Sequence, residues 1–154
     1  GPTLPTLQKS VKQAHLEGYF VFTGSIPYNA LGPYLMMSDL CVQLLNDWCM
    51  GTKVFMYMVH RRAVIAGGGW FNQYGQFLRN GKNSILIPPN VEVFAKEAVR
   101  VLTDSDLGSR LGRSAWETAS PYTWDMHADE TLRLLRASTG RTDQGNADSQ
   151  PPGA

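Results

Sequence analysis

The chain has 154 residues, 43% of them hydrophobic, and its formal net charge at pH 7 is +1. A chain of this size can bury one core, and the low net charge, without a basic cluster interleaved with aromatic residues, argues against a nucleic-acid-binding protein. No apolar run is long enough to cross a bilayer and no signal peptide is recognisable, so we expect a cytoplasmic protein, or one attached peripherally to a membrane.

The first forty residues predict a helix, a strand and a second helix. Apolar residues recur at helical spacing over residues 3–16, and Gly18 is placed to end this helix. Residues 19–23 are rich in aromatic and branched side chains and predict a strand that Gly24 closes. After a turn, residues 31–38 predict a short amphipathic helix.

The middle of the chain predicts three buried strands separated by helices. Residues 40–45, 63–66 and 84–87 are short apolar runs bounded by polar residues or glycine, which is typical of strands covered on both faces. Residues 52–60 predict the helix between the first two strands, and residues 70–79 predict a short helix before the third.

Three helices are predicted after the last strand: an amphipathic one over residues 91–102, and two more over residues 107–119 and 126–135. Three aromatic residues are expected to pack between these terminal helices and the sheet: Trp116, Tyr122 and Trp124. Residues 137–154 contain almost no hydrophobic side chain, which predicts a disordered polar tail. The folded domain is therefore expected to cover residues 1–136.

Strands alternate with helices along the chain, which predicts an α/β fold with a Rossmann-like parallel sheet flanked by helices. Right-handed crossovers place the loops that follow the strands along the carboxyl edge of the sheet, where such folds bind ligands. No carboxylate occurs from Trp48 through Val91, whereas this stretch contains five lysines and arginines: Lys53, Arg61, Arg62, Arg79 and Lys82. Positive charge on glycine-containing loops suits an anionic small molecule such as a nucleotide.

Cysteine and histidine spacing gives no sign of a disulfide framework or a metal site. Cys41 lies inside an apolar run, so a reduced, buried thiol is expected rather than a disulfide with Cys49. His15 and His127 have no acid, cysteine or serine at the spacing of metal ligands or of a catalytic triad, so we expect neither a metal cofactor nor a nucleophile there.

Seven segments follow one another in an order that matches a known pattern: residues 1–2, 19–27, 31–42, 53–58, 63–66, 81–89 and 120–125. Residues 53–58, for example, are similar to a K-l-f-E-Y-M helix, and residues 81–89 to a G-x-N-G-l-l-v-P-P turn and strand. This order resembles the nucleotide-binding C-terminal domain of the GT-B fold glycosyltransferases, specifically the family 4 group. The chain begins without methionine and without the first strand of that pattern, so we expect a fragment that is incomplete at its N-terminal end.

The resemblance implies a glycosyltransferase of the hexosyltransferase type. Its members transfer a sugar from a nucleotide-sugar donor to an acceptor hydroxyl, usually with retention of anomeric configuration and without a bound metal. The C-terminal domain holds the nucleotide, and the missing N-terminal domain would bind the acceptor, which is a glycan, a lipid or a small molecule. This fragment alone is therefore expected to be inactive, and no catalytic residue is predicted within it.

Two segments are expected to contact the donor because they match donor-facing parts of the family. The turn Gly24-Ser25-Ile26 corresponds to a turn that lies against the base. Gly51-Thr52-Lys53 opens the helix that faces the diphosphate, where free amides, the positive helix end and the lysine attract phosphate. The residues alone are equally compatible with an ordinary helix start and a solvated lysine. Gly67-Gly68-Gly69 is either a third donor-facing loop or a flexible connector.

The pattern departs from the family at the two glutamates that are normally separated by seven residues, which fall on Trp48 and Met56. The second glutamate normally accepts both ribose hydroxyls, and Met56 cannot make that charge-assisted contact. Two interpretations stay open: an active enzyme that binds the ribose differently, and a non-catalytic scaffold or regulatory domain with a degenerate donor site.

Overall fold

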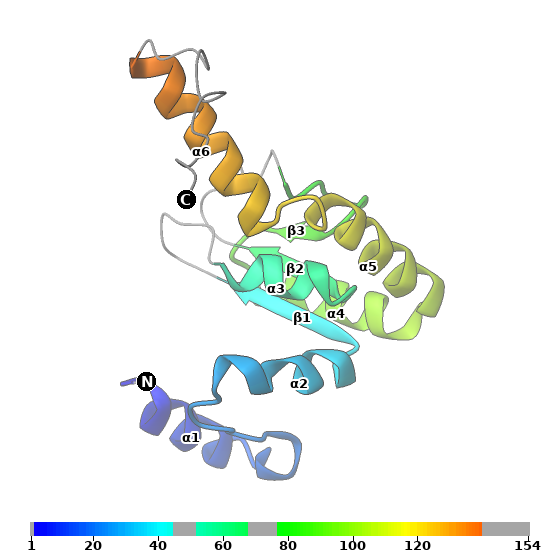
Figure 1. Cartoon of the computed structure of the whole chain (residues 1–154). Helices are drawn as coiled ribbons and strands as arrows, with labels where there is room; N and C mark the ends of the chain where they lie inside the picture. The colour runs from blue at the N-terminus through cyan, green and yellow to red at the C-terminus, as the bar shows by residue number, and fades with distance from the viewer. Residues whose placement is uncertain (1, 45–51, 68–76, 140–154) are drawn as a thin grey trace, which may run out of the picture. The chain divides into compact units, whose positions relative to one another are not determined.

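The computed structural model describes residues 2–44, 52–67 and 77–139 (Figure 1). The chain divides into two compact units, Gly1–Tyr34 and Leu35–Ala154, which we describe separately. Within the described residues, no helix combines the length and the apolar character that a membrane span requires.

The first unit opens with the predicted helix, α1 (Leu4–Gln13), which ends earlier than Gly18. The residue with the left-handed backbone is His15, with φ 55°. Its amide bonds to the carbonyl oxygen of Lys12, and the amide of Leu16 bonds to that of Val11. These two bonds form a Schellman motif, which closes the helix without a glycine.

The predicted strand at residues 19–23 is not formed. Residues Glu17–Tyr19 make a 3-10 helix (η1), and Phe20 is extended, with φ −119° and ψ 130°, but the segment joins no sheet in the described part of the chain. Its side chains are largely exposed, Val21 by 87%. The residues favour an extended backbone, but a strand also needs a neighbour to share backbone hydrogen bonds, and no local pattern can supply one. Gly24, where a turn is predicted, has a left-handed φ of 71°.

A second 3-10 helix, η2 (Tyr28–Ala30), leads into α2 (Leu31–Met37), as predicted for residues 31–38. The second unit then contains a parallel sheet of three strands in the order β1-β2-β3. The strands are β1 (Leu40–Leu44), β2 (Ala63–Gly67) and β3 (Ile85–Ile87). The predicted α/β fold and the three strands in the middle of the chain are therefore confirmed.

Four helices accompany this sheet: α3 (Lys53–Val59), α4 (Val91–Thr103), α5 (Ser105–Ala119) and α6 (Trp124–Thr139). The side chains of Asn90 and Asp104 cap α4 and α5 by accepting from the amides of Val93 and Leu107, each at 2.9 Å. These caps satisfy amides that have no partner within their own helix. All four helices were predicted from the sequence.

Several sequence predictions concern residues outside the described part of the chain. The helix predicted over residues 70–79 falls mostly there, as does the polar tail beyond Thr139. The described residues 137–139 belong to α6, so the tail does not begin at 137. The domain range 1–136 stays a prediction.

Side chains of β2 pack into two clusters on opposite faces of the sheet. Val64 and Ala66 join residues of α3 and α5, while Ala63 and Ile65 join residues of β3, α4 and α5. All five residues of β2 are buried, as expected for a parallel strand with both faces covered.

The prediction that the first strand is also covered on both faces is wrong. Cys41 and Gln43 are buried, but Val42 and Leu44 are 37% and 51% exposed. The register pairs Cys41 with Val64, so the buried face of β1 is the face that α3 covers. Because β1 is an edge strand of the described sheet, its second face is covered only in part: Leu40 packs against the cluster that includes α4, whereas Val42 and Leu44 lie beyond it.

Cys41 is a free, buried thiol, as predicted. Burial raises its pKa from 9.0 to about 11, and the positive charge of Arg62 lowers it by a smaller amount. The thiol is therefore protonated near neutral pH and serves as a small apolar core residue. Cys49 lies outside the described residues.

Of the three aromatic residues expected to pack between the terminal helices and the sheet, Trp116 and Tyr122 make ring contacts but are 37% and 52% exposed. Trp116 lies under the guanidinium of Arg61, with the Arg61 carbon 4.4 Å from the ring centroid. Tyr122 meets the ring of Phe77 edge to face, with the ring centroids 5.0 Å apart. Trp124 is 86% exposed, so the prediction that it packs against the sheet is wrong.

Candidate functional site

The carboxyl ends of the three strands lie side by side at one edge of the sheet. The register aligns Leu44, Gly67 and Ile87 at this edge. A Cβ atom on Gly67 would lie 2.9 Å from Cγ1 of Ile87 and 3.0 Å from Cδ2 of Leu44. Since Cβ atoms do not approach other atoms this closely, the central strand needs glycine where it reaches the edge.

Helix α3 starts at the same edge, because it is the element that follows β1 along the chain. Val54 and Met58 have no exposed surface and attach the helix to the core cluster on that face of the sheet. Thr52 and Lys53 are exposed, and the Thr52 side chain makes no capping hydrogen bond. Among the described residues, no acid lies within ion-pair distance of Lys53. The first turn of α3 therefore presents an uncompensated ammonium group near the strand ends.

Met56 lies one turn further along α3 and is half-buried. Residues three apart in a helix are neighbours on its surface, so Met56 and Lys53 lie on adjoining parts of one face. The Met56 carbonyl oxygen is 2.7 Å from Nδ1 of His60, which ends the helix. The Met56 side chain offers only a thioether sulfur, which is a weak hydrogen-bond acceptor.

The predicted donor-contacting residues fall into three groups: those at the start of α3, those in the turn at Gly24, and Gly51, which lies outside the described residues. Thr52, Lys53 and Met56 are brought together on α3, while the turn Gly24-Ser25-Ile26 belongs to the other unit. The φ of 71° at Gly24 explains the glycine, and a Cβ there would meet nothing within 4 Å. Whether the turn contacts a base stays a prediction.

The remaining predicted positions cannot be assigned a geometry. Gly51, Trp48 and the glycines at 68 and 69 lie outside the described residues. The question of whether the glycine run faces a ligand therefore stays open.

The structure separates the five cations of the carboxylate-free stretch. Among them, Lys53 lies at the carboxyl edge. Arg61 and Arg62 directly precede β2, and Arg79 and Lys82 precede β3, so these four lie at the opposite, amino edge. They therefore do not share one anion site with Lys53, because loops that enter and leave a parallel strand lie at opposite edges of the sheet.

The turn that leads into β3 is held by contacts that sequence reasoning did not identify. Asn83 is fully buried; its side chain accepts from the Arg79 amide at 2.7 Å and donates to the carbonyl oxygen of Phe77 at 2.7 Å. Its amide nitrogen also donates to Oγ1 of Thr118 on α5, at 3.0 Å. In the sequence, the only sign of these contacts is that Asn83 is the third residue of the G-x-N-G-like segment. At that position, an asparagine suggests a turn.

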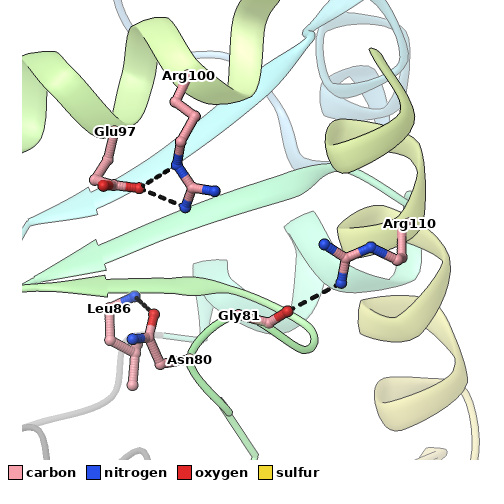
Figure 2. A network of polar contacts seen from close by, with 6 residues as sticks. All are labelled: Asn80, Gly81, Leu86, Glu97, Arg100 and Arg110. Atoms are coloured by element: carbon pink, nitrogen blue, oxygen red, sulfur yellow. Dashed lines mark hydrogen bonds and ion pairs between the residues drawn. The ribbon is translucent and has the colours of Figure 1, made fainter. Parts of the chain in front are cut away.

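Figure 2 shows two further contacts of this turn. The Asn80 side chain accepts from the amide of Leu86 at 2.9 Å, and the Arg110 guanidinium donates to the carbonyl oxygen of Gly81 at 3.0 Å. Arg110 lies on α5, so the turn is connected to that helix both by Arg110 and by the buried Asn83. The Glu97–Arg100 ion pair drawn beside them lies within α4.

Residues 1–104 match a family model described as Glycosyl transferases group 1. The chain belongs to this family. Its second unit has the Rossmann-like parallel sheet found in the C-terminal domain of GT-B glycosyltransferases, as the solved structures below illustrate. A search of curated proteins found no match.

Three solved structures share the fold of this group 1 glycosyl transferase chain at low sequence identity. The C-terminal domain of a group 1 family glycosyl transferase from Francisella tularensis is 22% identical with TM-score 0.66, covering 78% of this chain and 62% of that one. Sucrose-phosphate synthase from Thermosynechococcus elongatus is 21% identical with TM-score 0.77, and the match covers 91% of this chain and 35% of that one. HepE from Anabaena, solved in complex with UDP-glucose, is 16% identical with TM-score 0.75, covering 88% and 36%. The chain thus spans between about a third and two thirds of the length of these relatives.

Proposed function

We propose that this chain is the nucleotide-sugar-binding part of a glycosyltransferase. The whole enzyme would transfer a hexose from a nucleotide-sugar donor to an acceptor hydroxyl, with retention of anomeric configuration and without a bound metal. The observation that carries the proposal is the family match over residues 1–104, together with the parallel sheet whose carboxyl edge meets the start of α3. The complexes of HepE with UDP-glucose and with UDP and glucose give further support.

In this proposal the carboxyl edge of the sheet receives the nucleotide diphosphate. The exposed Lys53 ammonium, which has no acidic partner in the described chain, would attract the diphosphate. As the bond to the sugar breaks, negative charge develops on the departing nucleoside diphosphate, and a fixed cation beside it lowers the barrier. The turn Gly24-Ser25-Ile26 would lie against the base. The acceptor and the remaining catalytic groups would come from another domain, so this chain alone is expected to be inactive.

One observation favours a second candidate, a non-catalytic domain that acts as a scaffold or a regulatory partner. At the position where the family carries a ribose-binding glutamate, α3 carries Met56, whose sulfur cannot replace a carboxylate as an acceptor of two hydroxyl bonds. A domain that has lost this contact would keep the fold and bind nucleotides weakly or not at all.

Calorimetric titration with UDP-, GDP- and ADP-sugars separates the two candidates. Saturable binding of one of them supports the enzyme, whereas absence of binding to every nucleotide diphosphate would contradict it. Lys53→Gln should weaken nucleotide-sugar binding by about tenfold, because it removes one charge-assisted hydrogen bond that contributes about 1.5 kcal/mol. Lys96→Gln, an equally exposed lysine on α4, is the matched control and should leave the affinity unchanged.

A substitution that restores the acid tests whether the donor site is degenerate or simply different. Met56→Glu should raise the affinity for the nucleotide about 10- to 100-fold if the ribose site persists, because hydrogen bonds to a charged group contribute about 1.5–3 kcal/mol. Met37→Glu on α2 introduces the same charge at a well-exposed methionine and serves as the control. An unchanged affinity in Met56→Glu would mean that the ribose is bound by other residues or not at all.

A further inference from the structure

The amino edge of the sheet collects cations from two connections that are far apart in the sequence. Arg61 lies between α3 and β2, and the turn with Arg79 and Lys82 leads into β3. Because β2 and β3 are adjacent parallel strands, the residues that precede them lie at the same edge. The register pairs Ile65 with Ile85, so β3 begins level with the third residue of β2, at one strand spacing of roughly 5 Å.

Helix α5 crosses both connections and adds two more arginines. Arg110 donates to the carbonyl oxygen of Gly81 in the turn before β3, as Figure 2 shows. Two residues further on, Gly112 packs directly on the backbone of Arg61, and Trp116 lies under the Arg61 guanidinium. Arg113 lies between these contacts and is exposed. We call the resulting surface the amino-edge patch: Arg61, Arg79, Lys82, Arg110 and Arg113.

The charges of this patch are exposed and are not neutralised by ion pairs. In the described chain, ion pairs occur within α4, between Glu97 and Arg100, and within α6, between Glu130 and Arg133, but none involves a member of the patch. The nearest acids along α5 are Asp106 and Glu117, four residues before Arg110 and four after Arg113. Asp39, directly before β1, adds a third carboxylate at the same edge, and the five cations outnumber these three acids, so the surface keeps an excess of positive charge.

We propose that the amino-edge patch binds the surface of an anionic phospholipid bilayer. Four of its five cations are arginines, whose planar guanidinium groups match phosphate oxygens in two parallel hydrogen bonds. The charges are spread over two loops and one helix, which suits a partner that is itself an extended array of phosphates. Each lysine or arginine near such a membrane strengthens attachment by about fivefold.

A single-stranded nucleic acid also presents phosphates, but the patch suits it less well. Single-stranded nucleic acids are held by aromatic rings on which bases stack. Trp116 is the aromatic residue that contacts the patch, and its ring is already covered by the guanidinium of Arg61.

This placement leaves the candidate donor site accessible. Lys53 lies at the carboxyl edge, and β2 has five residues between the two edges, which corresponds to about 15 Å at roughly 3.3 Å per residue. Attachment to a bilayer through the amino edge would therefore keep the carboxyl edge away from the lipid surface. The proposal does not depend on the donor site being active.

The test measures co-sedimentation of the protein with vesicles of phosphatidylcholine that contain about 30% phosphatidylglycerol, at low and at physiological salt. The triple variant Arg79→Gln/Lys82→Gln/Arg113→Gln removes three patch charges whose side chains make no hydrogen bond or ion pair in the described chain. Its partition coefficient for these vesicles should fall by about 100-fold, because each of the three charges contributes about fivefold.

The control variant Lys9→Gln/Lys12→Gln/Lys96→Gln removes the same number of charges from exposed residues of α1 and α4. It should bind the anionic vesicles far better than the triple patch variant does. The circular dichroism spectra of the two variants should match each other. An equal loss of vesicle binding in both variants would show that net charge alone determines the binding, and it would overturn the proposal. Binding to vesicles of phosphatidylcholine alone that equals binding to anionic vesicles would overturn it too. Tighter, patch-dependent binding to a DNA or RNA duplex than to the vesicles would replace it with a nucleic-acid surface.

Discussion

Gly112 is the position where the packing of α5 can be tested most directly. A Cβ atom there would lie 2.2 Å from the carbonyl oxygen of Arg61 and 2.9 Å from its carbonyl carbon. The obstacle is backbone, held by the left-handed φ of 56° at Arg61, and cannot move aside as a side chain would. Gly112→Ala must therefore displace α5 by about 1 Å to restore a normal contact distance.

The expected cost follows from the size of that displacement. A gap of about 1 Å removes up to half of the dispersion energy between α5 and its neighbours, and overpacking of this kind costs about 1–3 kcal/mol, with more where backbone must move. Alanine recovers about 1 kcal/mol of helix propensity over glycine, so we expect a net loss of about 2 kcal/mol in the free energy of unfolding. Urea denaturation followed by circular dichroism measures it.

Gly108→Ala is the matched control on the same helix. Its Cβ would lie 3.5 Å from the carbonyl oxygen of Val101, an ordinary contact, so this variant should gain up to about 1 kcal/mol. The two alanine variants should therefore differ by about 3 kcal/mol in opposite directions. If Gly112→Ala is as stable as Gly108→Ala, then α5 does not pack on the backbone before β2 as described.

Three further predictions concern the buried turn and the thiol. Asn83→Ala should lower the free energy of unfolding by about 2–4 kcal/mol in thermal or urea denaturation, because it leaves buried polar partners unsatisfied. The control variant Asn80→Ala removes one exposed hydrogen bond and should lower it by at most about 1 kcal/mol. Similar losses in both would contradict a buried role for Asn83. In a Cys49→Ser background, native Cys41 should react with iodoacetamide far more slowly at pH 8 than in urea, since burial raises its pKa to about 11. For the same reason the stability that this thiol contributes is fully present below pH 9 and lost as the pH rises towards 11, so Cys41→Ala should flatten the alkaline decline measured by urea denaturation.

The strands of the core were predictable because their signal is local. Residues 63–66 and 84–87 are short apolar runs between polar or glycine residues, and nothing but a strand with two covered faces suits them. The exposure of Val42 and Leu44 was not predictable in the same way, because it depends on how far α4 extends across the sheet. Neither was the unpaired state of residues 19–23, since pairing depends on another segment of the chain.

The candidate site was predictable only in part. The resemblance correctly led to the start of α3, where Thr52, Lys53 and Met56 follow the first strand of the sheet. A count of charge along the sequence does not tell which cations lie at the same edge of the sheet. The parallel topology itself contains the correction: Arg61 and Lys82 precede strands, so they belong to the amino edge, whereas Lys53 follows one.

Retention of the fold and retention of donor binding are separable in this chain, and α3 shows why. Val54 and Met58 belong to the core cluster that holds the helix, whereas Met56 belongs to neither core cluster. Replacement of a ribose-binding acid at this half-buried position would therefore cost little stability, so the fold could persist after the contact was lost. Met56→Glu should accordingly change the free energy of unfolding by no more than about 0.5–1 kcal/mol, measured by urea denaturation beside the nucleotide titration. A loss of several kcal/mol in this variant, with Met37→Glu unaffected, would show that Met56 is a packing residue and that the two properties are coupled after all.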